Sequence, residues 1–484
     1  MQIQTPTWVK NAVFYQIFPD RFAKSIQLQK HPAMDVRLEA WAAPPTSQGY
    51  KGGDLWGVIE QLDYLQDLGI NAIYFTPIFQ SACNHRYHTH DYYQVDPLLG
   101  GNEAFFKLLK AAHQRHIKVV LDGVFNHASR GFFFFNDILE NGPNSPWLDW
   151  FKIKRWPLSA YDGKLPANYV SWVNNRALPQ FNHDNPAVRE YIMRIGEHWI
   201  EAGIDGWRLD VPAEVKTAGF WQEFRTRVKA INPEAYIVGE IWTDARQWLD
   251  GTQFDGVMNY LFTGPTMAFT AGDRVQMKYV EQPDYYPYPP LDAAGYAAKI
   301  QQLLELYPWE IQLTQLNLLA SHDTARLLTI AGGDQASVEL ATLLLLTFPG
   351  APSIYYGDEV GLPGGFDPDS RRSFPAKTQW NQALLQLHRQ LIALRRGHPA
   401  LCVGHYHVLL TQGEVYVFAR TLPEAELIIA VNAGIEPANV SCCPDRQVLT
   451  SQPQQQLYGP GHTSWPKGRR RRVSLERLST LGWR

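Results

Sequence analysis

The chain has 484 residues, of which 45% are hydrophobic and 19% charged, and its formal net charge is -3. This composition is typical of a globular protein, and the length predicts a large domain with a smaller partner domain rather than one ordinary core. The small net charge excludes a global field that would recruit nucleic acid, and no apolar run reaches the ~18 residues of a membrane span. We therefore expect a neutral or small ligand, no nucleic acid and no membrane.

The four cysteines, Cys83, Cys402, Cys442 and Cys443, are too few for a disulfide framework in a chain of this size. They lack the spacing of a zinc site, and the adjacent pair is awkward to bridge. Free thiols in a reducing compartment are the simpler interpretation. The first residues also lack the basic and then apolar segments of a secretory signal. We therefore expect a cytoplasmic protein.

From the start to about residue 395, short apolar segments of β type alternate with longer segments of helical period. The expected strands lie at 12–18, 72–75, 118–124, 205–209, 235–240, 256–260, 317–321 and 353–356. Segments with an apolar residue every three or four positions include 55–68, 102–116, 186–202, 220–231, 336–347 and 382–396. Eight strands alternating with helices predict an α/β fold, a (β/α)8 TIM barrel. A doubly wound open sheet would usually have a glycine-rich first turn, which is absent.

An irregular segment rich in aromatic residues follows the third expected strand, at about 128–185. A long loop at this point leaves a barrel at its C-terminal face, where barrel enzymes have their active sites, so the segment is expected to be a wall of the cleft. Packing on itself as a small subdomain is compatible with that role. After about residue 398, short β-type runs separated by turns predict an antiparallel β-domain.

The expected domains are therefore a barrel formed by 1–127 and 186–397, an inserted domain B at 128–185, and a C-terminal β-sandwich at 398–484. The run of arginines at 469–472 is interpreted as solvated surface rather than a polyanion site.

Ionisable side chains are concentrated at the ends of four expected strands. They are Asp122 and His127 after the third strand, Arg208 and Asp210 at the fourth, Glu240 at the fifth, and His322 and Asp323 at the seventh. One acidic residue after a strand is weak evidence, but four carboxylates with two histidines and an arginine at four strand ends seldom arise by chance. Catalytic groups of a barrel gather at this face, so we expect one shared site.

This set of residues suits hydrolysis of a glycosidic bond, which needs a proton donor and a carboxylate that stabilises an oxocarbenium-like carbon. Arg208 and Asp210 are two residues apart on a strand, so their side chains point to the same side, and the guanidinium would keep Asp210 ionised as a nucleophile. Glu240, among aromatic and apolar walls, would keep a raised pKa and donate the proton. Asp323 would be a second ionised carboxylate.

The blocks DGVFNH (122–127), GWRLD (206–210), GE (239–240) and SHD (321–323) resemble the motifs of the α-amylase superfamily of glycoside hydrolases, in order and spacing. The resemblance covers about residues 10–395. It implies a retaining mechanism with Asp210 as nucleophile, Glu240 as acid/base and Asp323 as the residue that stabilises the reacting sugar. Residues implied to bind that sugar are Tyr87, which stacks beneath it, and Asp122, His127, Arg208 and His322.

Finer matches resemble the neopullulanase, cyclomaltodextrinase and maltogenic-amylase subgroup. They are LPQFN (178–182), SPWLDWF (145–151), the run at 238–260, and Glu214 four residues after the nucleophile. This likeness implies an α-glucan oligosaccharide as substrate, with Glu214 and Trp242 among the residues that contact it. Trp242 is placed in the cleft because it follows Glu240 by two residues, whereas Trp56 and Trp172 are expected in the core.

Subgroup members usually carry a β-domain before the barrel that contributes to their dimer, and here the first strand begins near residue 12. We therefore expect a more open cleft, of the small debranching-enzyme type, and a possible homodimer that does not use an N-terminal domain. Cleavage of α-1,6 branch points and of α-1,4 links both stay open. A cyclomaltodextrinase or neopullulanase acting mainly on α-1,4 links and a transglycosidase are alternatives, and a non-catalytic carbohydrate-binding barrel is a remote one.

Calcium sites of related enzymes often use an Asn/Asp-rich loop after an Asp-Arg-Phe triplet and a later Gly-Gly-Asp. Here Asp20-Arg21-Phe22 is followed by 23–27, which is poor in oxygen ligands and contains a lysine, although Asp54 remains. We therefore expect no required metal and no other cofactor.

Overall fold

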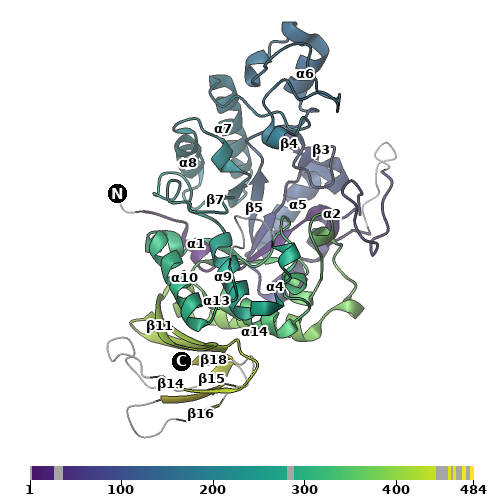
Figure 1. Ribbon diagram of the computed structural model, residues 1–484. Coiled ribbons are helices and arrows are strands. Elements are labelled where there is room, and N and C mark those ends of the chain that lie inside the picture. Colours follow the sequence, from purple (N-terminus) through teal and green to yellow (C-terminus); the bar gives the residue numbers. More distant parts are fainter. Residues whose placement is uncertain are drawn as a thin grey trace.

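The computed structural model describes residues 3–26, 36–280 and 288–442, together with the backbone of four short strands between residues 456 and 483; side chains are described as far as residue 439. Eight parallel strands form a closed barrel, with helices around it and a smaller sheet domain below it in Figure 1. The barrel strands are β1 (Phe14–Ile17), β2 (Ala72–Phe75), β5 (Lys118–Gly123), β6 (Gly206–Leu209), β7 (Tyr236–Gly239), β8 (Gly256–Asn259), β9 (Leu316–Leu318) and β10 (Ala351–Tyr355).

The predicted (β/α)8 barrel is confirmed, and every expected strand segment overlaps a barrel strand. The seventh differs most, because β9 ends at Leu318 whereas the apolar pattern placed the strand at 317–321. The apolar segment extends beyond the paired strand. After the strand, the amide N–H of Ser321 donates to the Thr324 hydroxyl at 2.9 Å, which turns the chain into the loop that carries His322 and Asp323.

Amphipathic helices cover the outside of the barrel. In α7 (Pro186–Glu201), the Asn185 side chain accepts from the Ala187 amide N–H and a proline occupies the first turn. Trp199 of this helix is fully buried, and its indole N–H donates to the Tyr92 carbonyl at 2.8 Å. Among the described residues, no helix combines the length and the apolarity that crossing a bilayer requires.

The segment expected as one helix at 55–68 forms two, which meet at Gln61. The remaining helices are α1 (Thr7–Lys10), α2 (Pro19–Phe22), α3 (Leu55–Glu60), α4 (Leu62–Leu68), α5 (Gly101–Gln114), α6 (Phe133–Asn141), α8 (Phe220–Ile231), α9 (Tyr260–Thr270), α10 (Ala293–Leu306), α11 (Trp309–Gln312), α12 (Leu327–Ile330), α13 (Gln335–Thr347), α14 (Gln382–Gly397) and α15 (Pro399–Val403).

Two excursions leave the C-terminal end of the barrel. The first is the antiparallel pair β3 (Phe79–Ser81) and β4 (Thr89–Val95), whose connecting loop carries Tyr87. The second follows β5, contains α6 and lies at the top of Figure 1. It packs on itself through rings such as Phe134 and Trp147, whose centroids are 3.8 Å apart. It is also tied to the loop after β5, since the Phe181 amide N–H donates to the Asn126 carbonyl at 3.1 Å.

The predicted C-terminal antiparallel domain is confirmed. One sheet has the order β11, β12, β13, β18, β15 and another the order β14, β17, β16. The strands are β11 (His405–Gln412), β12 (Val415–Leu422), β13 (Ala425–Asn432), β14 (Ala438–Cys442), β15 (Gln456–Tyr458), β16 (His462–Ser464), β17 (Arg471–Leu475) and β18 (Thr480–Trp483). Of the arginine run at 469–472, the first two residues and all four side chains lie outside the described part of the chain.

Two buried arginines meet at the end of α13, and one of them, Arg420, joins the β-domain to the barrel. Arg420 of β12 donates to the Thr347 carbonyl at 2.6 Å and to the Leu401 carbonyl at 2.9 Å. Arg395 of α14 donates to the carbonyls of Leu346 and Phe348, both at 3.0 Å. The last carbonyls of a helix have no partner within the helix, so these guanidinium groups supply the missing donors.

Close approach of β6 to β7 explains the glycine that opens β6. A Cβ added at Gly206 would lie 2.3 Å from the Tyr236 carbonyl oxygen, whereas one added at the exposed Gly163 would meet nothing within 4 Å. We predict that Gly206→Ala pushes the two strands apart and lowers the free energy of unfolding by about 1–3 kcal/mol. Chemical denaturation beside Gly163→Ala as the matched control measures this. Equal stability of the two variants would contradict the close approach.

Candidate active site

A single buried guanidinium lies at the centre of the strand ends. Arg208 of β6 is 0% exposed, and its Nη1 donates at 3.0 Å both to Asp122 Oδ1 and to Asp210 Oδ1. Its Nη2 is 2.9 Å from Glu240 Oε2, an ion pair without hydrogen-bond alignment. The barrel register produces this meeting, because Asp122 is the ladder partner of Arg208 and the Glu240 amide N–H extends the ladder to the Leu209 carbonyl.

Two further donors hold the Glu240 carboxylate. The Trp242 indole N–H donates to Oε1 and the Val211 amide N–H donates to Oε2, both at 3.1 Å. Val211 adopts a left-handed backbone (φ 35°, ψ 50°), an unfavourable conformation for a β-branched residue and one that often accompanies a functional site. Trp242 is itself fixed by stacking on Tyr260, with ring centroids 3.7 Å apart. Glu240 is therefore held in one orientation.

The pKa of Asp210 is shifted in the direction opposite to the one that the neighbouring arginine favours. Burial and the neighbouring Glu240 charge raise the pKa of Asp210 well above its usual range, and Arg208 opposes that rise without cancelling it. The guanidinium that was expected to hold Asp210 ionised therefore acts in the expected direction, while burial and Glu240 act against it. Burial likewise raises the pKa of Asp122 to about 6. The cluster draws protons because three carboxyl groups share one cation.

Tyr87, His322 and Asp323 form the opposite side of the site. The Tyr87 ring stacks on the His322 ring (5.5 Å between centroids, 4° between planes), and its hydroxyl donates to Asp122 at 3.0 Å. The Gln16 amide nitrogen is 2.8 Å from His322 Nδ1 and donates to it, so Nε2 carries the proton. Nε2 donates to the Tyr87 hydroxyl at 2.5 Å, and Asp323 Oδ2 lies 3.0 Å from the same nitrogen. Burial lowers the pKa of His322, which keeps the ring neutral.

Arg371 is a member of the site that sequence reasoning missed. Its Nη2 donates to Asp323 Oδ1 at 3.3 Å and its Nε donates to the His322 carbonyl at 2.9 Å. Burial raises the pKa of Asp323, and Arg371 is the largest influence that opposes this rise. Arg371 lies in a 3-10 turn (Asp369–Arg371) rather than at a strand end, so the pattern that found the other residues could not find it.

The insert after β5 supplies another wall. The Trp172 ring stacks on His127, with centroids 5.2 Å apart and planes 18° apart. The expectation that Trp172 is a core residue is wrong, since it lines the cleft. His127 is buried, and its Nδ1 is 3.2 Å from the side-chain nitrogen of Asn126. The side-chain oxygen of Asn126 accepts a hydrogen bond from Gln180 of the insert. Asn126 therefore fixes the insert to the loop that carries His127.

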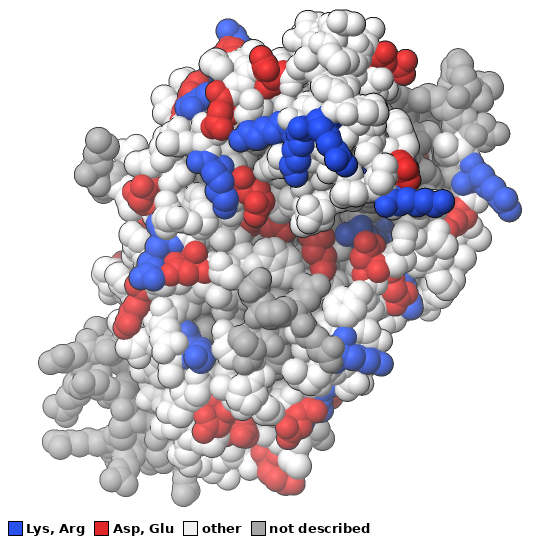
Figure 2. Space-filling view, turned by 45° about the horizontal axis from the view of Figure 1, so that its top comes forward, with Lys and Arg blue, Asp and Glu red and all other residues white. Residues whose placement is uncertain are grey.

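These walls enclose a cleft of about 530 Å³. In Figure 2, acidic side chains lie in the hollow near the middle of this face, with basic side chains above it. The residues lining the cleft are His85, Tyr87, His88, His127, Trp172, Asn175, Leu178, Asp210, Val211, Glu240, Trp242, Asp323, Asp367 and Arg371. The catalytic candidates Asp210, Glu240 and Asp323 thus meet in one cavity, as expected.

The other predicted binding residues are placed differently. Arg208, Asp122 and His322 are at most 1% exposed and lie beneath the cleft rather than on its wall. Their contacts hold the lining residues in position. Glu214 ends an exposed 3-10 turn after β6 and is not among the lining residues, so the structure does not bring it to the cleft.

The carboxylates considered for calcium have other partners. Asp20 accepts from the amide N–H groups of Lys51 and Gly52 and pairs with Arg21 at 3.0 Å. Asp54 accepts from the Gly57 amide N–H and so caps α3. Both carboxylates therefore have structural roles near the start of the chain.

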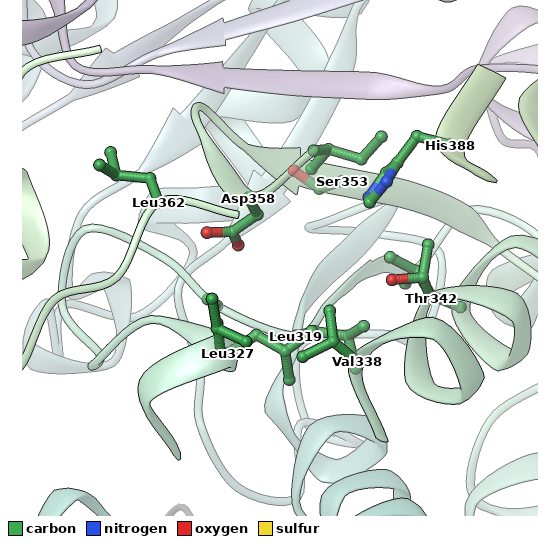
Figure 3. A pocket seen from close by; sticks show the side chains of 12 residues that line it. Leu319, Leu327, Val338, Thr342, Ser353, Asp358, Leu362 and His388 are labelled. Carbon is green, nitrogen blue, oxygen red and sulfur yellow. The ribbon is translucent and has the colours of Figure 1, made fainter. Parts of the chain in front are cut away.

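A second hollow lies between β9, β10 and the helices outside them, and Figure 3 shows its side chains. Its volume is about 20 Å³, room for about one water molecule and far too little for a sugar. Asp358 and His388 line it. Asp358 pairs with Arg326 at 2.9 Å, and the His388 ring is 2.8 Å from the Leu384 carbonyl. Because of its size we assign it no ligand.

Family models of known proteins match both parts of the chain. The model "Alpha amylase, catalytic domain" matches residues 16–384, and "Alpha-amylase C-terminal domain" matches residues 404–479. The chain belongs to the alpha-amylase family. It is therefore a glycoside hydrolase of that family, which cleaves α-glucosidic bonds.

Several alpha-amylase family members resemble this one closely. A cyclomaltodextrinase from a Bacillus species is 43% identical over 411 residues, which cover 84% of this chain and 70% of that protein. Neopullulanase 2 of Thermoactinomyces vulgaris is 42% identical over 434 residues, covering 88% and 70%. The crystal structure of the Nostoc punctiforme debranching enzyme is 69% identical, with a TM-score of 0.94 and full coverage of both chains.

His127 provides a test of which groups titrate in the cleft. Burial lowers the pKa of His127 to about 3, so the ring is neutral at any pH well above that value. We predict that His127→Asn lowers kcat/KM about 10-fold through the loss of a hydrogen bond to substrate, by the same factor at every pH between about 5 and 8. Rates on a maltooligosaccharide across that range measure it.

The acid limb of the same profile should belong to the carboxyl groups, because the raised pKa of Asp210 makes the ionised nucleophile disappear as the pH falls. A loss in His127→Asn that changed steeply near pH 6.5 would show that the ring titrates there and would contradict the assignment.

Proposed function

We propose that the protein hydrolyses α-glucosidic bonds with retention of configuration, with Asp210 as nucleophile and Glu240 as acid/base. The observation that carries this proposal is the contact of both carboxyl groups with the same guanidinium, at 3.0 and 2.9 Å. Two carboxyl groups that contact one cation lie close together. This favours the separation of about 5–5.5 Å between the two carboxyl groups of retaining enzymes over the roughly 6.5–9.5 Å of inverting enzymes.

In the first step, Glu240 protonates the glycosidic oxygen while an Asp210 oxygen forms a bond to the anomeric carbon, and the bond to the leaving sugar breaks. The raised pKa of Asp210 favours a proton held between the two carboxyl groups. A glycosidic oxygen within reach of Glu240 localises that proton there, and Arg208 stabilises the ionised Asp210. In the second step Glu240 removes a proton from water, which displaces Asp210 from the anomeric carbon.

The remaining lining residues are proposed to hold the sugar at the reacting position. Tyr87 offers a flat ring supported from behind by His322, a suitable surface for the C–H face of a pyranose. Asp323, paired with Arg371, would accept hydrogen bonds from ring hydroxyls and stabilise positive charge at the anomeric carbon. His127 would donate to a hydroxyl, and Trp242 would form the wall beside Glu240.

We further propose that branched α-glucans are the preferred substrates, with α-1,6 bonds cleaved faster than α-1,4 bonds. Two structural relatives support this. The debranching enzyme of Nostoc punctiforme matches over its whole length at 69% identity. A cyclic α-maltosyl-(1→6)-maltose hydrolase from Arthrobacter globiformis matches at 34% identity, with a TM-score of 0.86 and coverage of 99% and 100%. The cyclomaltodextrinase-like alternative is supported by the curated relatives.

The proposed place of action is the cytoplasm, supported by 37% identity to an intracellular maltogenic amylase of Bacillus subtilis. A homodimer, if it forms, would use surfaces of the barrel or of the β-domain. Transfer to a sugar hydroxyl instead of water is a second candidate activity of the same covalent intermediate, which the open rim of lining residues around Glu240 would admit.

The acid/base role is tested through the leaving group. We predict that Glu240→Gln lowers kcat on a maltooligosaccharide by a factor of about 10²–10⁴. On an activated aryl α-glucoside, the rate of formation of the covalent intermediate should fall much less, because a good leaving group needs no proton. Adding azide to Glu240→Ala should give the α-glycosyl azide. Asp210→Asn should lose activity on both substrates, and Glu201→Gln, on the exposed end of α7, is the matched control. Equal losses of Glu240→Gln on both substrates would contradict the assignment.

The bond preference is tested with a branched maltooligosaccharide, a linear one of the same glucose count and a cyclodextrin. We predict that the branch is released intact, with kcat/KM at least 10-fold higher than for the linear substrate, and product chromatography measures it. Faster cleavage of the linear or cyclic substrate would assign the protein to the cyclomaltodextrinase type. Products longer than the substrate would reveal transfer.

A further inference from the structure

Three potential metal ligands meet on the loop between β3 and β4, at the wall of the cleft. The sulfur of Cys83 and one ring nitrogen from each of His85 and His88 all lie within 4.8 Å of one another. The two imidazole rings are nearly perpendicular, with centroids 5.1 Å apart. A tetrahedral ion with bonds of about 2.0–2.3 Å needs ligand atoms about 3.3–3.8 Å apart. Small side-chain rotations close that difference.

The backbone of this loop is held in place without an ion. The Cys83 carbonyl accepts from the Arg86 amide N–H at 3.2 Å, and the Cys83 amide N–H donates to Ser81 Oγ at 3.2 Å. Arg86 has a left-handed φ of 61°, and its Nε donates to Asp96 at 2.9 Å. The Tyr87 amide N–H donates to His85 Nδ1 at 3.2 Å. The three ligands are therefore presented by a fixed turn, which lowers the ordering cost of binding.

The donor set selects the kind of ion. One thiolate and two imidazoles suit Zn²⁺ and similar late transition metals, whereas Ca²⁺ and Mg²⁺ prefer oxygen ligands. Three nearby arginines oppose a cation, Arg86, Arg130 and Arg371. Arg86 is paired with Asp96, Arg371 is paired with Asp323, and Arg130 lies over the Tyr161 ring at 4.5 Å. An ion would displace the thiol proton of Cys83, so the bound thiolate would offset half of its charge.

We propose that Cys83, His85 and His88 form a binding site for Zn²⁺ or a similar transition-metal ion, and that its occupation inhibits the enzyme reversibly. His85 and His88 line the cleft on either side of Tyr87, and the His85 ring stacks near the Tyr87 ring at 5.9 Å. Three protein ligands leave a fourth position for water, and an ion held by His85 and His88 would lie at the wall of the cleft. The inhibitory part rests on the proposed function, whereas the binding part does not.

Binding is measured first, on the full chain, with Co²⁺ as a spectroscopic probe and Zn²⁺ in calorimetry. For the native protein we expect one ion per chain and a sulfur-to-cobalt charge-transfer band. In Cys83→Ser the band should be lost and the affinity for Zn²⁺ should be at least 10-fold weaker than in the native protein. The double variant Cys442→Ser/Cys443→Ser is the matched control and should keep the band. Cys83→Ala replaces Cys83→Ser if the latter melts early. A band that is absent, or unchanged in both Cys83 variants, would overturn the site.

Inhibition is measured second, by adding Zn²⁺ to the hydrolysis assay and reversing it with a chelator. Cys83 is not among the lining residues, so Cys83→Ser should hydrolyse normally and need at least 10-fold more Zn²⁺ for half-inhibition. Equal sensitivity of both proteins, or Zn²⁺ binding without inhibition, would overturn the regulatory claim. Failure of the proposed function itself would instead appear as absence of hydrolysis without Zn²⁺, with the cobalt band intact.

Discussion

The contact of the Arg208 guanidinium with three carboxyl groups is the interaction on which the rest of the site depends. It joins the ends of β5, β6 and β7, and it does so with no exposure to solvent. Burial raises the pKa of Asp122 and Asp210, and the single guanidinium opposes that rise only in part. The buried carboxyl groups Asp122 and Asp210 therefore hold their protons more tightly than exposed carboxyl groups would.

Around this centre, the lining side chains are held by residues that do not touch the cavity. Gln16 fixes the His322 ring, His322 supports Tyr87, and Tyr260 supports Trp242. The insert is fixed in the same way, through the Asn126–Gln180 hydrogen bond. The three carboxyl groups around Arg208 lie at strand ends, while Tyr87, His127 and Trp172 reach the cleft from the loops beyond them.

The sequence predicted the strand-end residues because a barrel strand is a short apolar run whose last residue is polar, a pattern visible in Asp210 and Glu240. It failed where a residue reaches the site from outside that pattern. Arg371 comes from a turn 48 residues after its partner Asp323, and Trp172 from an irregular loop. Helix α9 was missed because nearly all of it is buried, which removes the polar stripe that reveals a surface helix. The spacing of the cysteines does not reveal the Cys83 cluster, because two of its three ligands are histidines.

The hydrogen bonds at the end of α13 make the barrel and the β-domain depend on each other. The carbonyls at this helix end are satisfied by Arg395, from the last long barrel helix, and by Arg420, from the β-domain. Neither arginine alone completes the cap, so removing the β-domain would leave barrel carbonyls without donors in a dry interior. The β-domain is therefore part of the barrel's own cooperative unit rather than an appendage, and loss of one is expected to carry the other with it in a single unfolding transition.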